Sequence, residues 1–223
     1  MAEPRGGRDA VRSHVGIAQA PWMRFEVLLA SFFTVYVACA LAAQALSAVP
    51  PSEEGAPIEA FTSGLLWIIA MYGLVRATES IETGRRLLFW LAVTAATGAL
   101  AVDEIVGVHE ATEPGFNDDW MKVVLWIATP FVLRYIANLE NAPRGSRVAM
   151  VVGYAFQTAY IFVETGDGEA FALPVSIDVL KWSEEVFEVL FLAAYAYALW
   201  ILVLRQHARR DQPAGLRRDE DES

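Results

Sequence analysis

Cysteine and histidine are scarce in this chain of 223 residues, which has one Cys and three His. With Cys39 alone no internal disulfide is possible, and sites that need several Cys or His ligands, such as hydrolytic zinc or haem, are not supported. No glycine-rich phosphate loop and no Ser/His/Asp order of a hydrolase can be read along the sequence. These absences argue against the most recognisable catalytic centres and leave open whether any reaction is catalysed.

Apolar residues, in contrast, are abundant at 55% and gather in six blocks separated by short charged stretches. Each block approaches the roughly 20 apolar residues needed to cross a bilayer. A soluble helical bundle would need a polar face at helical spacing along every block, and the first two blocks and the body of the third show none. The pattern therefore predicts an all-α, polytopic membrane protein with a six-transmembrane-helix bundle, in contact with the lipid bilayer. The predicted spans are 26–48, 58–78, 87–109, 120–138, 148–164 and 180–204.

Lysine and arginine are concentrated on one side of this predicted topology. Fifteen of the seventeen cationic residues fall on the side that carries both termini, and only Lys122 and Lys181 fall on the other. The positive-inside rule assigns the cation-rich side to the cytoplasm, so both termini are predicted to be cytoplasmic (N-in/C-in) in a bacterial inner membrane. The expected organisation is a cytoplasmic segment 1–24, a transmembrane domain 25–205 and a charged, disordered cytoplasmic tail 206–223.

Acidic residues are distributed the opposite way. The formal net charge is −10, and acids crowd the loops of the side opposite the termini. Nucleic acid is excluded as a partner of that face because its phosphates would be repelled. Cations or a basic protein surface are the partners that this charge favours.

Two segments carry acids into blocks that should be free of charge. "AVDEIVGVHE" (residues 101–110) closes the third block, and "LKWSEEVFEVLF" (180–191) opens the sixth; the fifth block adds one acid at its end. A lone carboxylate inside the membrane costs on the order of 2.5–3.5 kcal/mol, so it must be paired, protonated or bound to a cation. Helical spacing places Lys181, Glu184, Glu188 and Tyr195 on one stripe of the sixth block. The candidate site residues are Asp103, Glu104, His109, Glu110, Glu164, Glu184, Glu185 and Glu188.

These residues support several functions. Carboxylates from different helices with one imidazole suit a divalent metal ion, although no Glu-x-x-His motif of a di-iron bundle is present. Titrating acids also suit transport or a proton relay, with the site open outward only. A non-catalytic accessory or assembly subunit is the alternative, in which the acids pair with Lys122, Lys181, other membrane subunits or a second copy. A plainer interpretation places the acids of 101–110 in the headgroup layer.

At "AVDEIVGVHE" and "WSEEVFEVL" the chain resembles uncharacterised bacterial multi-pass inner-membrane proteins that pair a D-E-x4-H-E segment with a later E-E-x2-E segment. The resemblance covers these two short motifs only and implies no activity. It does not extend to Glu-Glu intramembrane proteases, which have a following Arg and later His motifs, or to ceramidase-like hydrolases, which use several histidines. It supports the choice of acids and His109 as candidate residues.

Overall fold

The computed structural model describes residues 21–48, 56–106, 119–167 and 176–210, and within them it is helical with no strand. All six helices are long and apolar enough to cross a membrane, as the sequence predicts. They are α1 (Pro21–Leu46), α2 (Pro57–Glu79), α3 (Gly84–Val106), α5 (Asp119–Leu139), α6 (Arg144–Asp167) and α7 (Ile177–Arg210).

The helices extend beyond several of the predicted spans. α1 begins five residues earlier, inside the expected N-terminal segment, and α7 continues to Arg210, inside the expected tail. The apolar run sets only the part of a helix that lies in hydrocarbon, whereas backbone hydrogen bonding continues into the interface, where water satisfies the terminal groups. Pro57 begins α2 because the first helical residue needs no N–H donor.

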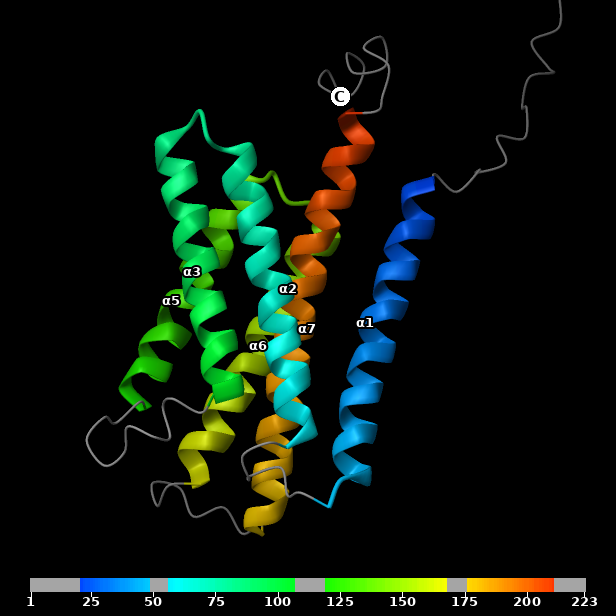
Figure 1. Ribbon diagram of the computed structural model, residues 1–223, viewed down its shortest axis with the longest axis vertical. Helices are drawn as coiled ribbons and strands as arrows, with labels where there is room; N and C mark the ends of the chain where they lie inside the picture. The colour runs from blue at the N-terminus through cyan, green and yellow to red at the C-terminus, as the bar shows by residue number, and fades with distance from the viewer. Residues whose placement is uncertain (1–20, 49–55, 107–118, 168–175, 211–223) are drawn as a thin grey trace, which may run out of the picture.

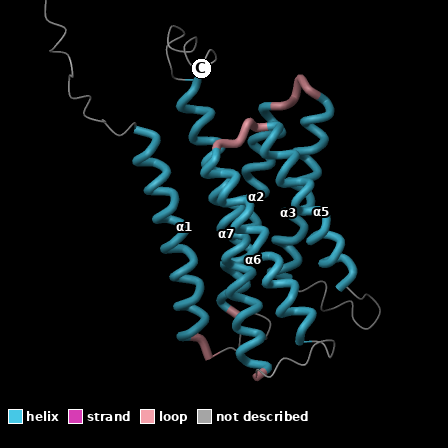
Figure 2. The backbone as a smooth tube through the Cα atoms, turned by 180° about the vertical axis from the view of Figure 1, so that it is seen from behind, coloured by secondary structure: helices cyan, strands magenta, loops and turns pink. Residues whose placement is uncertain are grey.

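The helices run alternately up and down, which divides the described connections between two ends of the bundle (Figure 1, Figure 2). α1 begins and α7 ends at the arginine-rich end, where the α2–α3 and α5–α6 turns also lie. Every arginine of the described residues lies nearer this end, whereas Lys122 and Lys181 lie toward the opposite, acidic end. The two sets of charges that the sequence separates are thus separated along the bundle axis.

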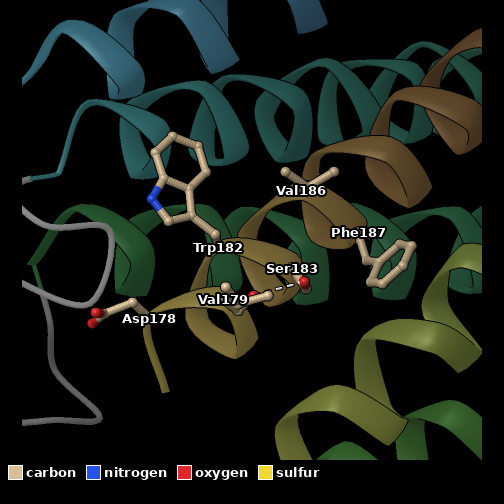
Figure 3. A pocket seen from close by; sticks show the side chains of 6 residues that line it. All are labelled: Asp178, Val179, Trp182, Ser183, Val186 and Phe187. Carbon is tan, nitrogen blue, oxygen red and sulfur yellow. Dashed lines mark hydrogen bonds between the residues drawn. The ribbon is translucent and has the colours of Figure 1, made fainter. Parts of the chain in front are cut away.

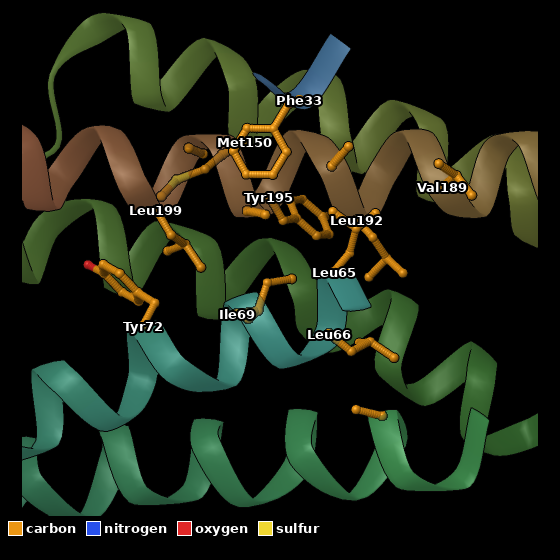
Figure 4. Packing of buried hydrophobic residues seen from close by; sticks show 14 of the residues in the cluster. Phe33, Leu65, Leu66, Ile69, Tyr72, Met150, Val189, Leu192, Tyr195 and Leu199 are labelled. Atoms are coloured by element: carbon orange, nitrogen blue, oxygen red, sulfur yellow. The ribbon is translucent and has the colours of Figure 1, made fainter. Parts of the chain in front are cut away.

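α7 lies at the centre of the packing and contacts α1, α2 and α6. Small and branched side chains of α7 interdigitate with α2 on one side and α6 on the other (Figure 4). Close packing of this kind, rather than exclusion of water, holds helices together in lipid. Buried side chains in this layer include Leu65, Ile69, Tyr72, Met150, Val189, Leu192, Tyr195 and Leu199.

α1 stands at the edge of the bundle (Figure 1, Figure 2), with apolar side chains such as Val27, Phe32 and Val35 exposed toward the position of lipid. Polar contacts attach it along its length. The Gln44 side chain accepts from the Ile58 backbone N–H at 3.2 Å, Tyr36 donates to the Phe61 carbonyl at 2.9 Å, and Arg205 pairs with Glu26 at 3.1 Å.

A buried ion pair closes the arginine-rich end. Arg76 of α2 pairs with Glu140, which follows α5, and with Glu79 one turn along its own helix. The Glu140 side chain is only 2% exposed. The turn is shaped by Asn141 at φ 48°, with Ala142 N–H bonded to the Ala137 carbonyl at 2.8 Å, the pattern of a Schellman cap.

Candidate functional site

Glutamates from three helices gather toward the acidic end of the bundle. Glu188 of α7 interacts electrostatically most strongly with four other glutamates, one from α3, one from α6 and two from α7. It is surrounded by protein yet keeps part of its surface accessible. We call this set the acidic cluster: Glu104, Glu164, Glu184, Glu185 and Glu188.

The face of α7 that carries the cluster is the one that the sequence predicts. Glu184 and Glu188 are one turn apart, and the Lys181 ammonium lies 3.3 Å from Glu184 at the preceding turn. Glu185 lies about 100° round the helix from Glu184 and interacts with Glu184, Glu104, Glu59 and Lys181. Counting from the start of α7, Glu188 lies about 16 Å along the helix, so it is well inside the span.

Glu104 reaches the cluster from the end of α3 and is held there by α2. The Thr62 hydroxyl donates to Glu104 Oε1 at 2.9 Å, and the neighbouring Ser63 hydroxyl donates to the Ala101 carbonyl at 2.9 Å. Thr62 and Ser63 are both buried. Sequence reasoning missed Thr62; its signal is an adjacent pair of hydroxyl residues inside an otherwise apolar helix.

Glu164 joins the cluster from α6 and forms an ion pair with Lys122 of α5. Its second oxygen, Oε2, is buried without a hydrogen-bond partner in the described residues, as is Oε2 of Glu185. The sequence named Lys122 and Lys181 as possible counter-charges, and both lie at the cluster. Two lysines nevertheless face five carboxylates.

Between the cluster and the arginine-rich end, neutral hydrogen bonds link α7, α6 and α5 at one level of the bundle. Tyr195 donates to Gln157 Oε1 at 2.7 Å, and Gln157 Nε2 donates to the Thr129 hydroxyl at 3.3 Å. Tyr195 lies two turns, about 10 Å, beyond Glu188. Because this chain runs across the bundle and not along it, it joins helices and does not extend the cluster toward the other end.

A complete metal-ligand set is not seen among the described residues, where no three His, Cys, Asp or Glu side chains are arranged to hold an ion. His109 and Glu110, two of the predicted ligands, lie outside the described residues. Asp103 is described and partly exposed, but it lies about 100° round α3 from Glu104. The structure therefore brings five of the eight predicted residues into one cluster.

A shallow hollow on α7 is separate from the cluster. Six residues of α7 line it: Asp178, Val179, Trp182, Ser183, Val186 and Phe187 (Figure 3). At about 100° per residue they occupy the helix face opposite Glu184 and Glu188. The hollow therefore faces away from Glu184 and Glu188.

No protein-family model, curated protein or solved structure matches this chain. Its chemistry must therefore be inferred from the acidic cluster itself. Clustered carboxylates can hold protons, and hard oxygen donors can coordinate Ca²⁺, Mg²⁺ or Mn²⁺.

Proposed function

We propose that this chain is a multi-pass protein of a bacterial inner membrane that binds a cation at the acidic cluster, with its arginine-rich end in the cytoplasm. The observation that carries the proposal is the surroundings of Glu188. Its strongest electrostatic neighbours are four glutamates on three helices, at a depth where charge is expensive. The charge separation along the bundle supports the orientation.

The need for a cation follows from electrostatics. Like charges brought together in a medium of low dielectric constant repel strongly, and burial penalises each ionised carboxylate further. Lys122 and Lys181 offset part of this cost through Glu164 and Glu184. Glu188 is a member of neither ion pair. Protons or a bound metal ion are therefore the remaining means of neutralising its charge.

Protons are the cation that the described geometry supports best, because carboxylates can share them without a fixed ligand set. A divalent metal ion would need further ligands, and His109 and Glu110 are the candidates outside the described residues. The run from Val189 to Leu204 carries no charged residue. This favours a site with access from the acidic end, suited to sensing or binding, over a path through the membrane.

Two measurements on the purified protein test the proposal. Metal content after equilibration with Ca²⁺, Mg²⁺, Mn²⁺ or Zn²⁺ detects a bound ion, and infrared absorption of protonated carboxyl groups detects bound protons. We expect one of these signals in the native chain, its loss in Glu188→Gln, and its retention in Glu26→Gln at the opposite end. A native chain that shows neither signal and co-purifies with fixed partners would instead support an accessory subunit of a larger membrane complex.

Glu188→Gln is also expected to leave the fold intact. The amide removes a repelled carboxylate and keeps its shape, so the free energy of unfolding should stay within about 1 kcal/mol of the native value or rise. Thermal unfolding in detergent measures this. A loss above about 2 kcal/mol would mean that Glu188 holds the helices together and has no need of a cation.

The orientation has its own test in a chain with Cys39→Ala. Ser176→Cys places a thiol at the exposed acidic end, and Glu82→Cys places one in the exposed α2–α3 turn. A membrane-impermeant maleimide should label only the first in spheroplasts and both after permeabilisation. Labelling of Glu82→Cys alone in intact spheroplasts would invert the proposed topology.

A further inference from the structure

The half of α5 nearer the acidic end is attached to the bundle differently from the rest of that helix. Three polar contacts to α6, spaced about one turn apart, hold residues 119–129, which we call the α5 arm. They are the ion pair Lys122–Glu164, the hydrogen bond from Trp126 Nε1 to the Thr158 hydroxyl at 3.0 Å, and that from Gln157 to Thr129 at 3.3 Å. Among the described helices, α6 is the one whose backbone lies in close contact with that of α5.

The other half of α5 has separate anchors. The Tyr135 ring packs edge-on against Phe89 of α3 at 4.7 Å, and Glu140 just beyond the helix pairs with Arg76 of α2. Pro130 lies between the two halves. Because proline has no N–H and its ring crowds the preceding turn, it weakens the helix at this point and marks a natural hinge.

Polar contacts decide where the arm rests because lipid offers apolar surfaces an equally good environment. Val124, Leu125 and Ile127 of the arm are already exposed toward the position of lipid. Helix association in a bilayer depends on close packing and on polar contacts between helices. Of the three contacts between the arm and α6, the Lys122–Glu164 ion pair is the one whose strength depends on charge.

We propose that the α5 arm is a charge-dependent element hinged at Pro130. Neutralising Glu164 removes the Lys122–Glu164 ion pair, and the arm then moves away from α6. This inference rests on the proposed cation binding for the event that neutralises Glu164 in the cell. The titratable and charged groups that interact with Glu164 come from each neighbouring helix: Lys122 on α5, Tyr160 on α6, and Glu184 and Glu188 on α7.

Pulsed electron paramagnetic resonance on the full chain with Cys39→Ala tests the hinge. Spin labels at Val124→Cys on the arm and Met71→Cys on α2 report the position of the arm, and both sites are exposed. Labels at Asn138→Cys, also an exposed position, and Met71→Cys report the anchored half. Glu164→Gln mimics the neutral state with the same shape, and Lys122→Met removes the other partner.

We expect Glu164→Gln and Lys122→Met each to lengthen and broaden the Val124–Met71 distance distribution while the Asn138–Met71 distribution stays as in the native chain. Lys181→Met, which breaks the ion pair within α7, is the matched control and should move neither. An unchanged Val124–Met71 distribution in both variants overturns the inference, and equal movement of both label pairs overturns the hinge at Pro130. Neither result bears on metal or proton binding, which the Glu188→Gln measurements test separately.

Discussion

Replacing Glu140 with alanine is expected to lower the free energy of unfolding by about 3–5 kcal/mol, because it strands a buried partner of an ion pair. The Glu140 side chain is 2% exposed and the Arg76 side chain 13% exposed, so water cannot replace the lost carboxylate. Glu79 is more exposed and contacts the guanidinium through Nη1. Thermal or chemical unfolding in detergent measures the loss.

Glu26→Ala is the matched control, since it breaks another interhelical pair whose members are 36% and 25% exposed. A partly exposed pair contributes about 0–1 kcal/mol, so this variant should stay close to the native chain. Equal losses for Glu140→Ala and Glu26→Ala would show that burial does not distinguish the two pairs. Glu140→Met alone should also lower the free energy of unfolding. Adding Arg76→Met to this variant should recover much of that loss, because both charges are then gone.

Gly153→Ala is expected to cost about 1–3 kcal/mol even though alanine favours a helix. A Cβ at this position would lie 2.6 Å from Tyr195 Cε1 and 2.7 Å from its Cδ1. The ring cannot retreat freely, because its hydroxyl donates to Gln157 at 2.7 Å and its other side packs on Phe191. Unfolding in detergent measures the cost of pushing α6 from α7.

Gly145→Ala provides the comparison, because a Cβ there meets no heavy atom within 4 Å. It should leave stability unchanged or raise it by up to about 1 kcal/mol. Adding Tyr195→Leu to Gly153→Ala should give less than the sum of the two single losses, since the clash is shared. Additive losses would mean that Gly153 is needed for a reason other than its contact with Tyr195.

The six helices could be predicted because the bilayer imposes a length on apolar runs, and that signal lies within each segment. The stripe of Lys181, Glu184 and Glu188 could be predicted for a related reason, since the helical repeat fixes it locally. The interaction of this stripe with glutamates of α3 and α6 was expected only from their similar depth, and the structure supports that expectation.

Contacts between distant segments were harder to foresee. The sequence shows Arg76 and Glu140 at the ends of different blocks, but nothing in either block specifies that α2 and the α5–α6 turn meet. The Thr62–Glu104 hydrogen bond depends in the same way on how α2 rotates against α3. Rotation about a helix axis is set by packing with its neighbours, which hydropathy does not encode.

The central position of α7 has a consequence for the order in which this protein is made. Of the six described helices α7 is translated last, yet α1, α2 and α6 all pack against it. Until α7 is inserted, the surfaces of α1, α2 and α6 that contact it are left uncovered. An insertase or a protease can bind the chain at these surfaces. Quality control of nascent chains should therefore centre on termination: a product truncated before residue 177 is expected to be degraded rapidly, although five complete spans have been translated.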